Sequence, residues 1–286
     1  MKYNLMTVIN SDYFDFGKLF VNSLYDRIDL ANIHKLYIYD TGLAERDRKY
    51  LSVFPQMEVI PTQLNTKHLL LHDEDWRKNV YSKTAFLLQV IEKDALPTVM
   101  IDSDCLFLSN FTDLIDPDYD FIACRREEKD AFSEYIASFF VINSMAKAEE
   151  FIKDWREEMF FGTENHKESP ALSRLINKGK YNVGVLPEDL VSYTGTKINE
   201  ATRIAHLKSA IELKTVEQRI NQPHLKMYIE KYLTPNPIVA AEMDWEADPV
   251  CSKNVTSDET KEPINPCLRN ISPQKRALLL KRLRKT

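Results

Sequence analysis

Two aspartates separated by one residue, Asp102 and Asp104, follow a short apolar run in this chain of 286 residues. The run 98–101 is typical of a buried strand, so the two acids stand at its carboxyl end. In an extended segment both carboxylates point the same way, and they repel each other unless a cation or hydrogen bonds hold them. Mg²⁺ and Mn²⁺ prefer oxygen ligands and often share them with substrate phosphates. The motif indicates a metal–diphosphate site, and its alternative interpretation is a solvated turn that ends a strand.

The segments around this motif alternate between strand-like and helix-like patterns. The first five predict a strand–helix–strand–helix–strand order, which indicates an α/β fold with a mostly parallel sheet flanked by helices. Apolar runs predict strands at 4–9, 35–39, 57–60, 98–101, 121–124 and 138–142. Helical spacing of apolar residues predicts helices at 16–28, 44–53, 81–91, 145–159 and 171–177.

Polar residues follow several of these strands, and ligands of open α/β sheets bind at the carboxyl ends of the strands. Asn10, Asp40 and Asn143 each follow or close a predicted strand, as Asp102 does. We therefore expect these polar groups to lie near one another. For Asn143, a strand-end cap is the alternative interpretation.

Glycine is scarce, with six residues in the chain, and no G-x-G-x-x-G or P-loop pattern occurs. A phosphate would therefore have to be held by a metal or by basic side chains. A serine hydrolase is disfavoured because the chain has no G-x-S-x-G elbow. Cys105 is predicted to be a packed core residue, since acidic neighbours suppress a thiolate.

The net charge of −5 is unevenly distributed, because residues 272–286 carry six basic residues and no acidic one. The acidic remainder disfavours nucleic-acid binding by charge. We expect a catalytic domain at 1–245 and a polar tail at 246–286 that ends in a basic amphipathic helix at 273–284. This helix is expected either to contact an anionic membrane face or to pack its leucines on the body.

No signal-peptide pattern and no apolar run of about 20 residues occurs, and the four cysteines lack metal-binding spacing. The expected location is therefore cytoplasmic, with peripheral contact at the inner membrane face if the basic helix docks there.

Several segments share their order and spacing with one family. They are Met6–Asn10, Phe20–Leu24, Leu36–Thr41, Tyr81–Thr84, Met100–Phe107, Ser138–Asn143 and Ala205–Lys208. Together they span about residues 3–210 and resemble GT-A-type nucleotide-sugar glycosyltransferases, of the kind represented by glycosyltransferase family eight and its relatives. The resemblance implies a GT-A fold and a Mn²⁺- or Mg²⁺-dependent transfer. The sugar would pass from a nucleotide diphosphate donor, with UDP expected, to a hydroxyl of a glycan or lipid-linked acceptor.

The resemblance also implies roles for individual residues. Asp104 and His206 would bind the metal, and Asp102 would bind the metal or the ribose. Lys83 and Lys208 would neutralise the diphosphate. The further donor-binding positions implied are Thr7, Asn10, Asp40 and Ser103.

The positions implied for the reacting atoms are Glu168 and Asn143. Glu168 stands where the family often has the acid of a D-[QE]-x-x-L segment, although its neighbour here is Ser169. An inverting reaction needs a carboxylate base, and Glu168 or Glu188 would supply it. Retention is favoured only by the likeness to family eight.

The chain departs from the family pattern in two further places. Ser138 stands where the acceptor-side strand often begins with Gly, and the motif after His206 lacks the usual Gly and Pro-Trp. A non-catalytic nucleotide- or glycan-binding module of the same fold is therefore an alternative. A sugar nucleotidyltransferase is a weaker alternative, because those enzymes usually carry a Gly-rich N-terminal loop.

Overall fold

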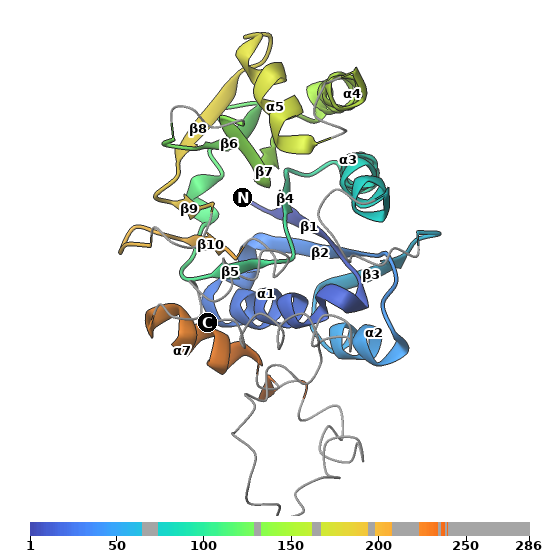
Figure 1. Ribbon diagram of the computed structural model, residues 1–286, viewed down its shortest axis with the longest axis vertical. Coiled ribbons are helices and arrows are strands. Elements are labelled where there is room, and N and C mark those ends of the chain that lie inside the picture. Colours follow the sequence, from blue (N-terminus) through green and yellow to red (C-terminus); the bar gives the residue numbers. More distant parts are fainter. Residues whose placement is uncertain are drawn as a thin grey trace, which may run out of the picture. The chain divides into compact units, whose positions relative to one another are not determined.

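The computed structural model describes residues 1–64, 74–128, 133–161, 167–193, 198–207 and 223–233, together with positions 236, 237 and 239. The principal elements (Figure 1) are β1 (Tyr3–Ile9), α1 (Phe14–Arg27), β2 (Ile33–Asp40), α2 (Glu45–Ser52), β3 (Met57–Pro61), α3 (Glu74–Asp94), β4 (Thr98–Ile101), β5 (Cys105–Phe107), β6 (Phe121–Arg125), β7 (Tyr135–Ile142), α4 (Met145–Phe161), α5 (Glu168–Asn177), β8 (Val183–Pro187), β9 (Val191–Ser192), β10 (Ile204–His206) and α7 (Pro223–Leu233).

The main sheet has seven strands in the order β3-β2-β1-β4-β7-β6-β8. Neighbouring strands are parallel everywhere except on the two sides of β7, which runs antiparallel to both β4 and β6. The predicted α/β class and its parallel beginning are therefore confirmed. The reversed direction of β7 decides which of its ends faces the candidate site.

Helices cover both faces of the sheet because its central strands are apolar on both sides. On one face, Phe140 of β7 stacks 5.3 Å from Phe151 of α4 and lies 5.3 Å from the ring of Trp155. On the other face, α1 approaches β1 so closely that a Cβ on Gly17 would lie 3.2 Å from the side chain of Ile9. Figure 1 shows α1 and α2 on one side of β1 and β2, with α3 on the other.

A second, three-stranded sheet has the order β5-β10-β9. β10 pairs antiparallel with β5 and parallel with β9. No local pattern in the sequence predicts β8, β9, β10 or α7. β9 and β10 are two and three residues long, too short to display a period.

Three predicted elements begin at least three residues earlier than expected. α3 begins at Glu74 rather than at residue 81, β7 at Tyr135 rather than 138, and α5 at Glu168 rather than 171. In α5, Pro170 lies in the first turn, where a backbone N–H has no helical partner to lose. Pro170 is thus part of the helix, and Glu168 stands at the helix start.

The predicted tail 246–286 and its basic helix lie outside the described residues. Within the part of the chain that the structure describes, no helix combines the length and apolarity that crossing a bilayer requires.

Candidate metal and donor site

Three candidate metal ligands meet where β4 ends. Asp102 and Asp104 lie in the tight turn between β4 and β5, which is closed by a hydrogen bond from the amide of Cys105 to the carbonyl of Asp102 at 3.1 Å. The pairing of β10 with β5 sets His206 opposite Cys105, and Leu207 N donates to Asp104 O at 2.8 Å. As a result, His206 Nε2 lies 3.2 Å from Asp104 Oδ1 and 3.7 Å from Asp102 Oδ2.

The chemistry of this group suits a divalent cation. One ligand atom from each of Asp102, Asp104 and His206 lies within 4.8 Å of the others. Their side chains are between 8% and 21% exposed, so the site is enclosed but open to a small ligand. Two carboxylates and one imidazole fill only part of a coordination shell, which leaves positions for water or phosphate oxygens. The residues therefore fit the metal that the resemblance implies.

A buried ion-pair triad lies beside this group. Lys83 of α3 places its Nζ 2.5 Å from Asp102 Oδ1 and 2.8 Å from Glu168 Oε1. Burial alone would lower the pKa of Lys83, but the charges and hydrogen bonds of the two carboxylates outweigh it and raise that pKa. Lys83 thus stays cationic and links the turn that carries Asp102 to the first residue of α5.

One carboxylate oxygen of Glu168 accepts no hydrogen bond from the described residues. Its Oε1 accepts from Lys83, whereas the buried Oε2 has no hydrogen-bond partner among the described residues. Burial raises the pKa of Glu168, the charge of Lys83 opposes this rise, and the charge of Asp102 adds to it. A buried acceptor without a donor is costly, so Oε2 is suited to a hydroxyl of a bound molecule.

Asn10 and Asp40 lie at the carboxyl ends of β1 and β2, as expected. Ile9 pairs with Asp40, and Met6 of β1 pairs with Met100 of β4, so all three strands end at the same edge as Asp102. Asn10 Oδ1 accepts from the amide of Tyr13 at 3.1 Å.

The carboxylate of Asp40 is occupied by its own loop. It accepts hydrogen bonds from the amides of Gly42 at 2.8 Å and Leu43 at 2.6 Å, and from Arg48 Nε at 2.5 Å. Asp40 therefore shapes the loop after β2. Thr7 lies inside β1, buried, and its hydroxyl has no partner among the described residues.

Asn143 does not lie with the other polar groups, so the expectation that it would is wrong. β7 is antiparallel to β4, with Ile142 opposite Thr98, and its carboxyl end therefore lies at the opposite edge of the sheet from Asp102. Asn143 Nδ2 donates to the carbonyls of Asp116 and Tyr119 at 2.8 and 3.0 Å. The alternative interpretation of Asn143 as a strand-end cap fits this position, and a role at the reacting atoms does not.

Three other residues were candidates for donor binding or for the base, and they differ in where they lie. Ser103 is buried in the turn between the two aspartates. Lys208 lies outside the described residues. Glu188 follows β8 and is 5% exposed, and its Oε2 accepts from the backbone amide of Glu127 at 3.0 Å. Glu188 therefore holds a loop.

The thiol of Cys105 is buried next to the aspartates. Burial raises the pKa of this thiol, and the charges of Asp104 and Asp102 raise it further. Cys105 is thus a core residue, as the sequence predicts.

An aromatic side chain that no sequence motif marks lies beside His206. The ring of Tyr193 lies 5.6 Å from the His206 ring, and the guanidinium of Arg126 lies 4.7 Å from the Tyr193 ring. Tyr193 directly follows the two-residue strand β9, so only the pairing of β9 with β10 reveals its position.

Known proteins provide an independent comparison. The sequence profile of the nucleotide-diphospho-sugar transferase family matches residues 48–215, more than half of the chain. This range includes Lys83, Asp102, Asp104, Glu168 and His206. No curated protein sequence matches the chain at a significant level.

Two solved structures share the fold. Galactosyltransferase LgtC, in complex with donor and acceptor sugar analogues, superposes with a TM-score of 0.57 at 11% identity, over 84% of this chain and 100% of LgtC. The apo structure of the bifunctional glycosyltransferase WbbM gives a TM-score of 0.52 at 13% identity and covers 81% of this chain. The match spans about half of WbbM, 51% of its length. At such identities the likeness shows the fold alone. With the family profile, it shows that this chain belongs to the nucleotide-diphospho-sugar transferase family and has the GT-A glycosyltransferase fold.

Proposed function

We propose that the chain is a metal-dependent glycosyltransferase. It transfers a sugar from a nucleotide diphosphate donor, with UDP as the expected nucleotide, to a hydroxyl of a glycan or lipid-linked acceptor. One observation carries the proposal: Asp102, Asp104 and His206 converge within 4.8 Å although His206 comes from a distant part of the chain. An enclosed set of two carboxylates and one imidazole beside a buried lysine is suited to a metal-bound diphosphate.

In the reaction, the bond between the anomeric carbon and the diphosphate oxygen breaks, and its electron pair leaves with the nucleoside diphosphate. A bond forms from the acceptor oxygen to the anomeric carbon, and the acceptor hydroxyl gives its proton to a basic oxygen, either of the leaving diphosphate or of a carboxylate such as Glu168. A bound Mn²⁺ or Mg²⁺, held by Asp102, Asp104 and His206, would neutralise the leaving diphosphate as a Lewis acid.

The protein's own residues position the substrates. Lys83 fixes the orientation of Asp102 through its 2.5 Å contact and keeps the carboxylate charges compensated before the donor binds. Glu168 Oε2 accepts a hydrogen bond from a sugar hydroxyl, because the described residues offer it no donor. Asn10, Thr7 and the loop shaped by Asp40 line the nucleoside pocket. Ser103 and Lys208 also bind the donor in this proposal.

A thermal-shift titration tests the proposal. The protein is titrated with UDP, GDP, CDP and ADP, each with and without Mn²⁺, and the Tm is recorded. Ligand at 100 times its Kd stabilises the folded protein by about 2.7 kcal/mol. We expect a shift that requires both UDP and Mn²⁺. Asp104→Asn should abolish it, whereas Asp118→Asn, at an exposed loop aspartate, should leave it unchanged.

The remaining outcomes separate the alternatives. A shift with another nucleotide would keep the enzyme class and replace the donor. A UDP shift without hydrolysis or transfer of any UDP-sugar would identify a non-catalytic binding module. An unchanged shift in Asp104→Asn would refute the metal assignment.

A further inference from the structure

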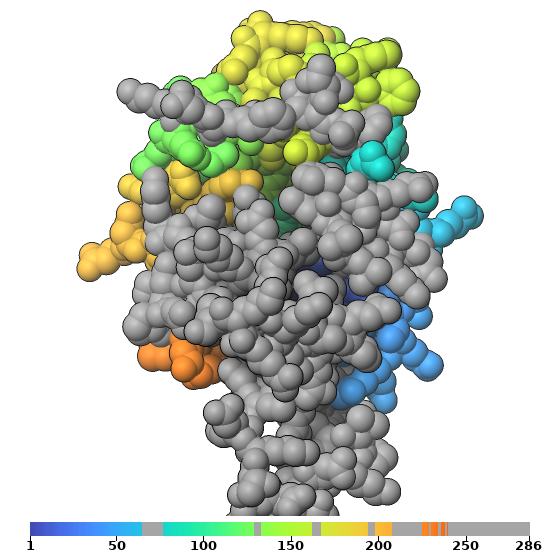
Figure 2. Space-filling model, viewed as in Figure 1, coloured from blue at the N-terminus to red at the C-terminus, as the bar shows by residue number. Residues whose placement is uncertain are grey.

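Lys83 and Glu168 form an ion pair between two helices, and each of these helices is bound by a residue of α4. The two α4 residues are consecutive, Trp155 and Arg156. Lys83 lies on α3, and Glu168 begins α5. α4 packs against both helices. Figure 2 shows side chains of α3 and α4 meeting at the surface. The position of Lys83 relative to Glu168 therefore depends on the contacts that α4 makes with the two helices.

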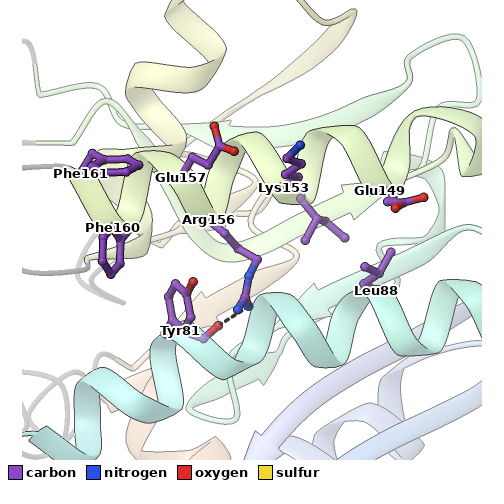
Figure 3. A pocket seen from close by; sticks show the side chains of 9 residues that line it. Tyr81, Leu88, Glu149, Lys153, Arg156, Glu157, Phe160 and Phe161 are labelled. Carbon is purple, nitrogen blue, oxygen red and sulfur yellow. Dashed lines mark hydrogen bonds between the residues drawn. The ribbon is translucent and has the colours of Figure 1, made fainter.

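Arg156 fastens the turn of α3 that contains Lys83. Its Nη1 donates to the carbonyl of Tyr81 at 3.0 Å and to Thr84 Oγ1 at 2.9 Å. Its guanidinium carbon lies 4.0 Å from the centre of the Tyr81 ring. Figure 3 shows Arg156 reaching from α4 across a groove to Tyr81, with the hydrogen bond drawn. The residues that Arg156 binds lie on either side of Lys83 in the sequence, so the arginine holds the backbone that aims the lysine.

Trp155 fastens the start of α5. Its ring is fully buried, and its Nε1 donates to the backbone carbonyl of Glu168 at 3.0 Å. This hydrogen bond holds the main chain of the residue whose side chain accepts from Lys83. The two α4 residues thus bind the main chain at Glu168 and the helix turn around Lys83, at both ends of one ion pair.

We propose that Trp155 and Arg156 are positioning residues that set the distance between Lys83 and Glu168, and through Lys83 the orientation of Asp102. This inference rests on the proposed function for its kinetic consequence. A planar guanidinium bound to two oxygens and stacked on a ring fixes both the distance and the angle of the helix turn, which a lysine ammonium does not do. Misplacing a group by about 1 Å from its productive position slows a reaction by up to about a hundredfold.

The test uses conservative variants and a matched control. Arg156→Lys keeps the charge but loses the double hydrogen bond, and Trp155→Phe keeps a ring but loses the donor. The control is Arg174→Lys. Arg174 lies on α5, six positions after Glu168, and also binds α4, donating to the carbonyl of Glu158 at 2.8 Å and to its carboxylate at 2.9 Å. Circular dichroism verifies that each variant is folded.

We expect Arg156→Lys and Trp155→Phe each to lower kcat/KM on the order of tenfold, mainly through kcat. Arg174→Lys should lower it less than twofold. The decisive measurement is the effect of the same substitution on kcat/KM in a protein that already lacks one partner of the ion pair. In Lys83→Met, Arg156→Lys should cost less than twofold, because the group that it positions is gone. Trp155→Phe is tested in the same way in a Glu168→Gln background. If Lys83→Met does not fold, Arg156→Lys is tested in the Glu168→Gln background instead.

The inference is overturned if Arg156→Lys lowers kcat/KM by the same factor in wild type and in Lys83→Met. It is also overturned if Arg174→Lys lowers kcat/KM as much as Arg156→Lys does. In either case α4 is a packing element only. A urea-unfolding cycle on the same variants separates this inference from the proposed function, since it needs no activity. Non-additive urea midpoints for Arg156→Lys with Lys83→Met, and additive ones for Arg174→Lys, support positioning even if the protein transfers no sugar. Additive midpoints for both pairs overturn it.

Discussion

Replacing Lys83 by Met should destabilise the protein strongly, because it leaves two carboxylates without their shared cation. The side chains of Lys83, Asp102 and Glu168 are 10%, 21% and 12% exposed, so water compensates little of the loss. Breaking a buried pair by removing one partner costs about 3–5 kcal/mol. Because Asp102 remains partly exposed, we expect the free energy of unfolding to fall by about 3 kcal/mol, near the lower end of this range.

The assay is urea unfolding in the presence of EDTA, followed by circular dichroism. With a slope of about 3 kcal/mol per molar urea, the midpoint should fall by about 1 M. The matched control is Lys180→Met. Lys180 also contacts two carboxylates, Asp154 at 2.7 Å and Glu150 at 2.8 Å, but its side chain is 45% exposed. We expect no measurable change of midpoint there.

A compensating substitution tests the electrostatic cause. Glu168→Gln in the Lys83→Met background removes one of the two repelling charges and should recover part of the lost midpoint. Equal midpoint shifts in Lys83→Met and Lys180→Met would refute the reasoning. The absence of any recovery would show that lost packing, not unpaired charge, causes the destabilisation.

Three further predictions follow from other parts of the chain. Cys105 should resist alkylation by iodoacetamide at pH 7 until urea unfolds the protein, because burial and the charge of Asp104 raise its pKa; labelling of the native state, read by mass spectrometry, would contradict its buried position. Hydrogen bonds from two lysines lower the pKa of Glu58 below 4.5. Wild type should therefore be more stable than Glu58→Gln above that pH, and this advantage should vanish as the pH falls through the lowered pKa; a difference in urea midpoint that persists at pH 2.5 would contradict it. Deletion of residues 272–286, with six basic and no acidic residues, should abolish co-sedimentation with anionic liposomes; unchanged binding would rule out the membrane role.

The first half of the fold can be predicted from local patterns, because parallel strands and their helices leave clear periods in the sequence. Asn10, Asp40 and Asp102 close or follow such strands, and the right-handed crossover rule places their ends at one edge. Strand direction, by contrast, is not encoded in an apolar run. β7 is buried along all eight of its residues and has the pattern expected of a parallel strand, so its reversal, and with it the position of Asn143, could not be foreseen.

The nearness of His206 to the aspartates depends on the register between β5 and β10, which no local pattern contains. Only the likeness to a family pointed to that histidine. The sequence does not show the ion pair of Lys83 with Glu168 for a similar reason, because this contact joins residues of two helices that lie 85 positions apart. Trp155 has the helical spacing of a core residue, and the sequence does not show that its ring nitrogen binds the chain at Glu168.

The pairing of β10 with β5 also has a consequence for how the protein matures. Cys105 and His206 are partners although they lie roughly one hundred positions apart, so this contact closes a long loop and is expected to form late in folding. During synthesis, both aspartates emerge from the ribosome well before the histidine. The nascent chain therefore carries only part of the proposed set of metal ligands until β10 has been made and has paired with β5. Affinity for a divalent ion would then report the completion of folding, and a chain interrupted before β10 would retain the acidic pair but lack its nitrogen ligand.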